Sequence, residues 1–247
     1  MGIDLPPDTE PGPAVADPLF SVRGQTVLVS GASRGIGYAI AEGFAQRGAT
    51  VVLTGRDDST VKEAAERINR TDTSGEGQAF GAVCDVADTD AITRLVDITL
   101  EKLGPIDTLV NVAGVNRRKP ALEVTEEDYD FVVDRNLKGA FFLSKAVGLT
   151  MVERGSGNQI NIGSLTTLRP GPHLLPYAVS KAGMGRMTEA LAVEWGPRGV
   201  RVNCIAPGFI LTDLTKSLWA EPKMQDWGIP NTPLRRLGVP GDLVGAA

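Results

Sequence analysis

The sequence predicts an α/β fold in which one doubly wound parallel sheet is covered by helices on both faces. Short apolar runs alternate with longer segments whose apolar residues recur at helical spacing, and this alternation repeats six times. The connections are short, and a glycine-rich turn follows the first run directly. Because no repeat or linker interrupts the pattern, we expect a single three-layer α/β/α domain over residues 21–247.

The expected strands are continuous apolar runs of the kind found inside a parallel sheet. They cover residues 26–30, 50–54, 79–84, 108–112, 159–162 and 200–205. Helices are expected between residues 37 and 48, and over residues 59–69, 88–103, 136–154 and 177–195. Thr125 is predicted to cap a further helix, because three acidic residues follow it and favour a helix start.

Composition and charge exclude several classes of function. The chain has 247 residues, of which 42% are hydrophobic, and a net charge of -5, so it is long enough to bury a core and has no basic run for nucleic acid or anionic lipid. No apolar stretch is long enough to span a membrane. Residues 1–20 are rich in proline and acids and lack the apolar centre of a signal peptide, so we expect a disordered extension and a cytoplasmic protein.

Cysteine and histidine usage argues against a metal site. Cys84 and Cys204 each lie in an apolar run and are predicted to be buried thiols rather than a disulfide. His173 is the only histidine, which disfavours a histidine-built metal centre or a Ser-His-Asp triad. We therefore expect no metal.

Tyr177 and Lys181 form the first candidate catalytic pair. They are four residues apart in an expected helix, so they lie on one face of it. A lysine cation beside a phenol lowers the pKa of the phenol, which can then exchange a proton with an oxygen atom. Ser164, after the expected strand at 159–162, could hold the same oxygen. The set suits the interconversion of a carbonyl and an alcohol; the alternative is ordinary helix surface.

The glycine-rich turn predicts a dinucleotide site. Gly31, Gly35 and Gly37 stand between a strand and a helix, where glycine lets the backbone approach a diphosphate and the helix start binds its charge. The spacing is GxxxGxG rather than GxGxxG, and the alternative is a plain β-α turn. Two residues decide the nucleotide: Arg34 and Arg56 favour the 2′-phosphate of NADP(H).

NAD(H) remains the alternative cofactor. A ribose-binding acid is expected about 20 residues after the glycine turn, and Gly55 stands near that place. Asp57 or Asp58 could take the ribose hydroxyl instead of a 2′-phosphate.

Together, these residues resemble the short-chain dehydrogenase/reductase family, from about residue 24 to residue 242. The motifs that carry the resemblance are the glycine turn at 30–37, Asp85-Val86, the NVAG sequence at 111–114, Asn136, Ser164, Tyr177-x-x-x-Lys181 and Pro207-Gly208. The segments 194–208 and 233–238 are similar to sugar-acid dehydrogenases of the gluconate and deoxygluconate type. The 3-oxoacyl-carrier-protein reductases are similar over the same span, so both subgroups stay open.

The resemblance implies a Rossmann fold and a role for each motif. Ser164 would polarise the carbonyl, Tyr177 would be the acid or base, and Lys181 would also hold the nicotinamide ribose. Asn136 would kink its helix and hold a water that relays protons to Lys181. The implied cofactor contacts are Gly31, Ser33, Arg34, Gly35, Ile36, Gly37, Arg56, Asp85, Val86, Asn111, Ala113, Gly114, Tyr177, Lys181, Pro207, Gly208, Ile210 and Thr212.

Some of these positions have structural alternatives. Asp85 could cap a strand end, Asn111 could be a structural strand residue, and Thr212 could cap the next helix. Val112 replaces the second asparagine common in the family, and we expect little effect from it. The chain ends at Ala247, where the family usually continues into a last strand. We therefore expect a sheet without that strand, and a homodimer or homotetramer if the C-terminus is complete.

The substrate is expected to be a small molecule over the nicotinamide position. The basic cluster Asn116-Arg117-Arg118-Lys119 could attract a carboxylate or phosphate, although a solvated loop is the alternative for at least two of the four. His173 could touch a sugar hydroxyl, with an ordinary surface-loop histidine as the alternative. Trp219, Met224 and Trp227 suggest an apolar lid, with a helix packed on the body of the domain as the alternative. The function expected is oxidation or reduction of a sugar acid or polyol. The alternatives are an acyl-carrier-protein reductase and a nucleotide-binding protein without chemistry.

Overall fold

A computed structural model describes residues 21–71 and 76–247, and the expected N-terminal extension at 1–20 lies outside the described residues. The described part contains one six-stranded parallel sheet in the order β3-β2-β1-β4-β5-β6. The strands are β1 Thr26–Ser30, β2 Thr50–Gly55, β3 Gln78–Val83, β4 Thr108–Asn111, β5 Gly157–Ile162 and β6 Val200–Ile205. The predicted doubly wound parallel sheet is therefore confirmed, with strand ends shifted by two residues or fewer.

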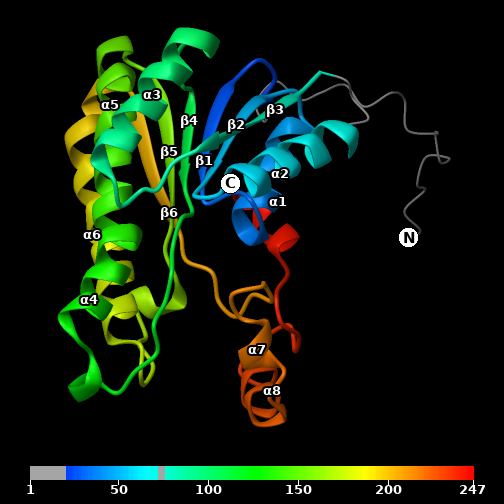
Figure 1. The fold of residues 1–247 in the computed structure, drawn as a ribbon, viewed down its shortest axis with the longest axis vertical. Helices are drawn as coiled ribbons and strands as arrows, with labels where there is room; N and C mark the ends of the chain where they lie inside the picture. Colours follow the sequence, from blue (N-terminus) through cyan, green and yellow to red (C-terminus); the bar gives the residue numbers. More distant parts are fainter. Residues whose placement is uncertain (1–20, 72–75) are drawn as a thin grey trace, which may run out of the picture.

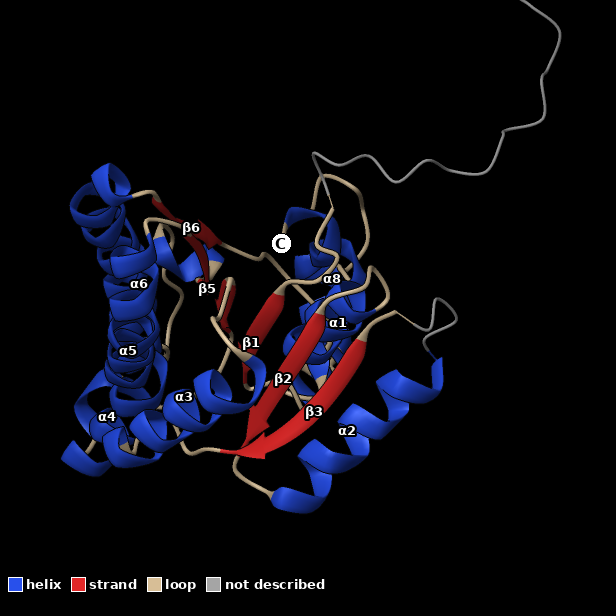
Figure 2. Cartoon of the chain, turned by 90° about the horizontal axis from the view of Figure 1, so that it is seen from above, coloured by secondary structure: helices blue, strands red, loops and turns tan. Residues whose placement is uncertain are grey.

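Helices cover both faces of the sheet, as Figures 1 and 2 show. One face carries α1 (Gly35–Ala45) and α2 (Asp58–Thr71), and the other carries α3 (Thr89–Leu103), α5 (Gly139–Arg154) and α6 (Leu175–Trp195). The strand order switches between β1 and β4: β2 and β3 are added on one side of β1, and β4, β5 and β6 on the other. Such a switch point leaves an open crevice at the carboxyl ends of the strands.

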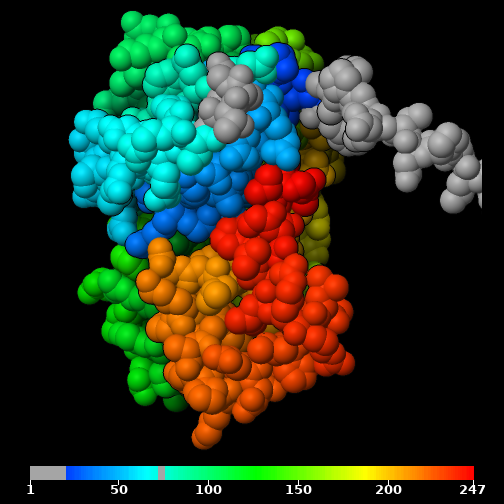
Figure 3. All heavy atoms as spheres, turned by 90° about the vertical axis from the view of Figure 1, so that its right-hand side faces the viewer, coloured from blue at the N-terminus to red at the C-terminus, as the bar shows by residue number. Residues whose placement is uncertain are grey.

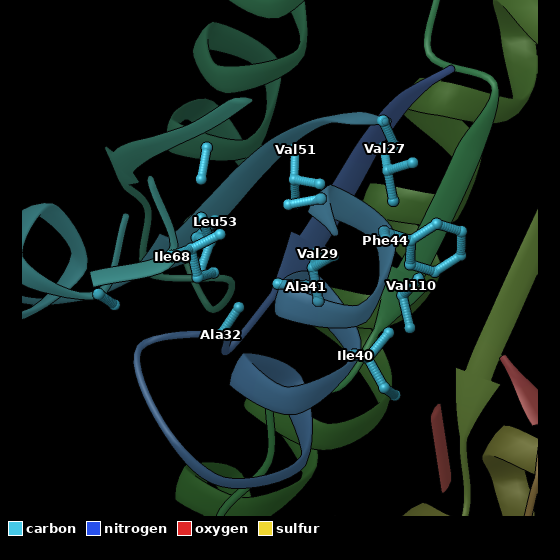
Figure 4. Packing of buried hydrophobic residues seen from close by; sticks show 14 of the residues in the cluster. Val27, Val29, Ala32, Ile40, Ala41, Phe44, Val51, Leu53, Ile68 and Val110 are labelled. Carbon is cyan, nitrogen blue, oxygen red and sulfur yellow. The ribbon is translucent and has the colours of Figure 1, made fainter. Parts of the chain in front are cut away.

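Alternate residues of the strands pack into two separate hydrophobic cores, one on each face of the sheet. Val27, Val29 and Val51 pack against Ile40 and Phe44 of α1 on one face (Figure 4). Leu28 and Val52 point to the opposite core beneath α3 and α5. Because both faces of the sheet are buried, each strand is a continuous run of apolar residues, and this pattern allowed the strands to be predicted from the sequence.

The shorter elements shape the carboxyl edge. They are η2 Ala121–Glu123, α4 Glu126–Val133, a π-helical segment Asp134–Lys138, η4 Leu165–Thr167, η5 Gly196–Arg198, α7 Lys216–Trp219, α8 Pro222–Gly228 and η6 Pro240–Ala246. Thr125 caps α4 as predicted, with its hydroxyl accepting from the Asp128 amide at 3.2 Å. The helix predicted from Asn136 instead begins as π-helix at Asp134 and becomes α-helix at Gly139. In Figure 1, α7 and α8 form a small lobe below the sheet.

Candidate active site

The catalytic candidates come from three elements that meet at the carboxyl edge of the sheet. Ser164 stands two residues beyond the end of β5, and Tyr177 and Lys181 lie one turn apart near the start of α6. Asn136 comes from the π-helical segment and is fully buried. The sequence therefore located four groups that the fold brings to one place.

Lys181 is a buried cation site with one backbone partner. Its Nζ donates to the carbonyl oxygen of Ile162 at 2.6 Å, and only 3% of the residue is exposed. Burial lowers the pKa of Lys181 to about 8, because the charged ammonium loses its hydration. The group can thus change its charge near working pH.

Tyr177 is not acidified by Lys181 in the way the sequence suggested. The lysine Nζ lies 5.9 Å from the centre of the tyrosine ring and points its proton at a backbone carbonyl instead. Burial raises the pKa of Tyr177, while hydrogen bonding with Ser164 and the positive charge of Arg118 act in the lowering direction. The prediction that Lys181 lowers the pKa of Tyr177 was therefore wrong. The groups that oppose the effect of burial on this pKa are the Ser164 hydroxyl and Arg118.

Asn136 holds the start of the neighbouring loop. Its side chain accepts from the Val115 amide at 2.7 Å and donates to the Val115 carbonyl at 2.9 Å and to the Ser180 hydroxyl at 3.1 Å. The π-helical turn explains how a buried helix residue reaches a loop, since the wider turn interrupts the regular ladder. A Cβ on Gly114 would lie 3.4 Å from the Asn136 Oδ1 and 3.7 Å from the Lys181 Nζ, so the three groups meet.

The glycine turn has the geometry that a diphosphate needs. Gly31 and Gly35 have φ angles of +64° and +61°, which favour glycine. A Cβ on Gly31 would stand 2.6 Å from the Ala113 Cα, so the ends of β1 and β4 approach too closely for any side chain. No side chain caps the start of α1, where Arg34 is the N-cap. The free N–H groups of that helix start can therefore bind an anion.

A cavity of about 300 Å³ lies beside the glycine turn and is rich in arginine. Ser33 and the two arginines predicted from sequence, Arg34 and Arg56, line it. A third, Arg67 of α2, also lines it and stacks over the Tyr38 ring at 3.9 Å. Sequence reasoning missed Arg67, because it looks like any exposed residue of a polar helix until α2 packs beside α1. No ion pair joins these three arginines to another side chain within the described ranges.

Asp85 and Asn111 already have protein partners. One Asp85 oxygen accepts from the Ala87 amide at 3.1 Å, and the other pairs with Arg135 at 3.3 Å. The Asn111 side chain is buried and donates to Ser144 and Asn161, both at 2.9 Å. The side chain of Asn111 therefore supports the core; its cofactor role stays a prediction, as does that of the buried Val86.

The segment after β6 crosses to the glycine turn. A Cβ on Gly35 would lie 3.8 Å from the side chain of Thr212, which follows Pro207 and Gly208 in the chain. Ile210 is held by a parallel bridge to Gly238. The Thr215 hydroxyl accepts from the Thr212 amide at 3.0 Å. Thr215, not Thr212, is the N-cap of α7, so the capping alternative for Thr212 was wrong, and its cofactor contact stays a prediction. Ile36 is half-buried in the same turn.

The predicted lid is a small aromatic lobe. The Phe209 ring lies 5.1 Å from Trp219 and 5.2 Å from Trp227, measured between ring centres. Trp219 is buried, whereas Trp227 is half-exposed. Figure 3 shows this lobe as the orange and red surface, with the end of the described chain lying against α1. Its position after β6 agrees with a cover for the crevice.

The basic cluster is not uniform. Arg117 and Lys119 both pair with Asp128, at 3.0 and 2.5 Å. Arg118 is exposed and has no ion pair within the part of the chain that the structure describes. His173 is exposed with a φ of +61°, and its carbonyl oxygen accepts from the Lys119 amide at 3.3 Å. Two members of the cluster are thus paired with a carboxylate, and Arg118 is the exposed member of the four.

Other groups of the described residues are accounted for without a ligand. Cys84 is buried, as predicted, and burial raises its pKa to about 11, whereas Cys204 is only half-buried. Residues 21–71 and 76–247 contain no cluster of three or more His, Cys, Asp or Glu side chains arranged for a metal ion. None of their helices is long and apolar enough to cross a bilayer.

Comparison with known proteins agrees with this geometry. The family model described as short chain dehydrogenase matches residues 25–223. The chain is 39% identical to gluconate 5-dehydrogenase of Gluconobacter oxydans over 230 residues, which are 93% of this chain and 88% of the relative. It is also 39% identical to the 3-oxoacyl-[acyl-carrier-protein] reductase of Synechocystis over 92% of this chain and 89% of that protein.

A solved structure extends the comparison to the fold. The gluconate 5-dehydrogenase of Burkholderia cenocepacia J2315, crystallised with NADP and tartrate, aligns with a TM-score of 0.85 at 32% identity, covering 92% of this chain and 88% of the other. That relative binds the cofactor predicted for this chain. The sheet order, the glycine turn, the Ser-Tyr-Lys-Asn set and these similarities lead to one conclusion: the chain belongs to the short-chain dehydrogenase family.

Proposed function

We propose that this chain is an NADP(H)-dependent oxidoreductase that interconverts a carbonyl and a secondary alcohol on a sugar acid or polyol. The observation that carries the proposal is the meeting of Ser164, Tyr177 and Lys181 at the carboxyl edge of the sheet, next to an uncapped helix start. A hydroxyl pair beside a titratable amine is suited to hold and protonate one oxygen atom.

The chain's own residues would manage that oxygen. A nicotinamide bound along this edge would supply or accept the hydride at the substrate carbon. Ser164 would donate a hydrogen bond to the carbonyl oxygen, and Tyr177 would pass its phenolic proton to it, or take one back in the oxidation direction. Lys181, held on the Ile162 carbonyl oxygen, would carry a charge that changes near working pH, because burial lowers its pKa to about 8.

The arginine cavity supports NADP(H) over NAD(H). Arg34, Arg56 and Arg67 bring three cations to one cavity of about 300 Å³ that also holds two carboxylates, Asp57 and Glu63, and a 2′-phosphate carries the charge that the excess cation would neutralise. Asp57 also lines the cavity, but its carboxylate accepts hydrogen bonds from Ser59 and Thr60 of the next helix. That engagement makes it a poorer partner for a ribose hydroxyl, although NADH stays the alternative to test.

Arg118 supports a carboxylate on the substrate. It is the exposed cation of the basic cluster, and its positive charge acts on the pKa of Tyr177, so it lies within electrostatic range of the reacting oxygen. The relative crystallised with NADP and tartrate is a gluconate 5-dehydrogenase, and tartrate is a hydroxy acid. A sugar acid with its carboxylate near Arg118 is therefore the substrate class we favour.

A 3-oxoacyl-[acyl-carrier-protein] reductase is the second candidate, because a relative of that name is as similar as the gluconate enzyme. Such an enzyme needs a basic surface for its acidic carrier protein. Here Asp128 neutralises Arg117 and Lys119, which leaves a weak basic patch. A nucleotide-binding protein without chemistry is the third candidate, and the intact Ser-Tyr-Lys set argues against it.

The experiment is a substrate panel followed by absorbance at 340 nm. We expect turnover of 5-ketogluconate with NADPH, slower turnover with NADH, and little with acetoacetyl thioesters. Tyr177→Phe should reduce kcat by at least about 10³-fold and leave NADPH binding unchanged, because the variant loses only the proton donor. Undiminished turnover by Tyr177→Phe would remove Tyr177 from the mechanism, and turnover of thioesters alone would favour the second candidate.

A further inference from the structure

The loop at residues 115–119 carries three consecutive cations but gives them unequal surroundings. Its first residue is fastened to Asn136 through both the amide and the carbonyl of Val115. At its other end, the Lys119 amide donates to the His173 carbonyl at 3.3 Å. The loop is therefore fixed at both ends, and the side chains between them determine what it offers to a substrate.

Asp128 forms ion pairs with two of the three cations. Its side chain is only 5% exposed and pairs with Arg117 at 3.0 Å and with Lys119 at 2.5 Å. The same carboxylate accepts from the Thr125 amide and hydroxyl, at 3.2 and 3.0 Å. Four donors around one nearly buried carboxylate form a fixed anchor, and such an anchor is stronger than an exposed ion pair.

Arg117 and Arg118 are adjacent in sequence but point to different partners. Arg117 stacks over the Phe131 ring at 3.9 Å while it binds Asp128, so it faces α4. Arg118 has no ion pair within the described residues and is the one cation of the loop whose charge acts on Tyr177. Asp128 of α4 thus binds the residues on both sides of Arg118, which leaves Arg118 as the exposed cation of the loop.

We propose that Asp128 is a positioning residue for the substrate: by binding Arg117 and Lys119, it holds the loop so that Arg118 meets a substrate carboxylate. The proposal rests on the proposed function. It explains why the site would prefer substrates that carry a carboxylate. Asp128 itself touches no substrate. Without it, Arg117 would keep its Glu127 pair at 3.1 Å, but Lys119 would lose its carboxylate partner and compete with Arg118 for the substrate, which would lose its fixed orientation.

The test is Asp128→Asn in the full chain, compared on 5-ketogluconate and on an uncharged ketohexose. The amide keeps the shape and the capping oxygen but loses the charge that holds the cations. We expect the KM for 5-ketogluconate to rise by about 10-fold, with kcat within about 3-fold and the ketohexose kinetics little changed. Asp128→Glu, which keeps the charge, should restore most of the KM.

Matched controls separate positioning from stability. Asp130→Asn alters an exposed carboxylate of the same helix that makes no ion pair within the described residues, and should leave both substrates unaffected. Thr125→Ala removes the helix cap and one of the four donors to Asp128 but keeps both ion pairs, so it should lower the unfolding temperature and raise the KM much less than Asp128→Asn. Equal changes of KM for both substrates in Asp128→Asn, or no change for either, would overturn the proposal.

A second measurement does not depend on activity. Trypsin cuts after Arg117 and Arg118, while the Lys119-Pro120 bond resists it. We expect cleavage in this loop to be at least about 10-fold faster in Asp128→Asn than in Asp130→Asn, because loop opening becomes easier. Equal rates would overturn the anchoring role. If the wild-type protein reduces neither substrate, the proposed function fails, and the trypsin rates alone decide the role of Asp128.

Discussion

At the scale of single residues, the active site depends on where each charge is placed rather than on which residues are present. Lys181 donates a hydrogen bond to the Ile162 carbonyl oxygen. Burial raises the pKa of Tyr177, while hydrogen bonding with Ser164 and the charge of Arg118 act to lower it. A buried amine that donates to a backbone oxygen keeps its position in both charge states. The lysine is thus fixed before any cofactor arrives.

The buried position of Lys181 gives stability a pH dependence that can be measured. The folded protein lowers its pKa from 10.5 to about 8, so the unfolded chain binds more protons between those values and stability rises with pH there. Relative to Lys181→Met, we expect wild type to gain about 1 kcal/mol of unfolding free energy per pH unit from pH 8 to pH 10. Urea denaturation of both proteins measures the difference.

An exposed lysine is the control for that prediction. Lys223→Met changes a surface residue of α8 and should give a pH profile parallel to that of wild type. If the wild-type and Lys181→Met profiles are also parallel, the lysine does not titrate in this range, and its charge state in the mechanism needs another explanation.

At the scale of elements, the cofactor site depends on how closely β1 and β4 approach each other. Gly31 at the end of β1 and Ala113 after β4 leave no room for a Cβ between them. The approach places the glycine turn, the start of α1 and the NVAG segment around one crevice. The same close packing is what makes the turn intolerant of a side chain.

Substitutions at two glycines with similar φ angles can distinguish the cost of backbone strain from the cost of this close approach. Gly31 (+64°) and Gly155 (+75°) both have positive φ, but a Cβ on Gly155 would meet only the Arg198 carbonyl oxygen, at 4.0 Å. Gly155→Ala should cost about 1 kcal/mol of unfolding free energy from strain alone. Gly31→Ala should cost about 2–4 kcal/mol and weaken NADPH binding at least about 10-fold, since overpacking adds to the strain.

Thermal unfolding and NADPH fluorescence titrations of the two variants check this prediction. Similar losses in both variants would mean that the ends of β1 and β4 can separate without cost. The crevice would then be more adaptable than its geometry indicates.

At the scale of the whole molecule, helices α5 and α6 present an apolar face to solvent. Phe141 and Leu149 of α5 are 42% and 63% exposed, and Val193 of α6 is 79% exposed. The two helices lie side by side on the same face of the sheet in Figures 1 and 2. Exposed apolar residues gathered on adjacent helices are typical of a surface that binds another protein.

We expect that surface to bind a second copy of the chain, in line with the homodimer or homotetramer predicted from sequence. Wild type should then sediment at a multiple of 26.1 kDa, and Leu149→Glu should shift it toward the single-chain mass. Leu122→Glu changes a fully exposed leucine outside this face and should have no effect. Sedimentation at 26.1 kDa by the wild-type chain would exclude this interface.

The sequence by itself determined the sheet, the order of its elements and the types of catalytic group. These signals are local: apolar runs mark strands buried on both faces, glycines mark a turn that no other residue fits, and a four-residue spacing places Tyr177 and Lys181 on one side of a helix. They depend on the residues within one or two turns of the chain. Packing of distant elements changes them little.

The tertiary structure alone decided which partner each polar side chain has. It brought Arg67 to the arginine cavity, placed the Asn111 side chain in the core, and paired Asp128 with Arg117 and Lys119 but not with Arg118. Each outcome is a choice among several partners of similar chemistry. Such a choice depends on distances of a few ångströms between elements that are far apart in the sequence, and these distances exist only once the layers have packed.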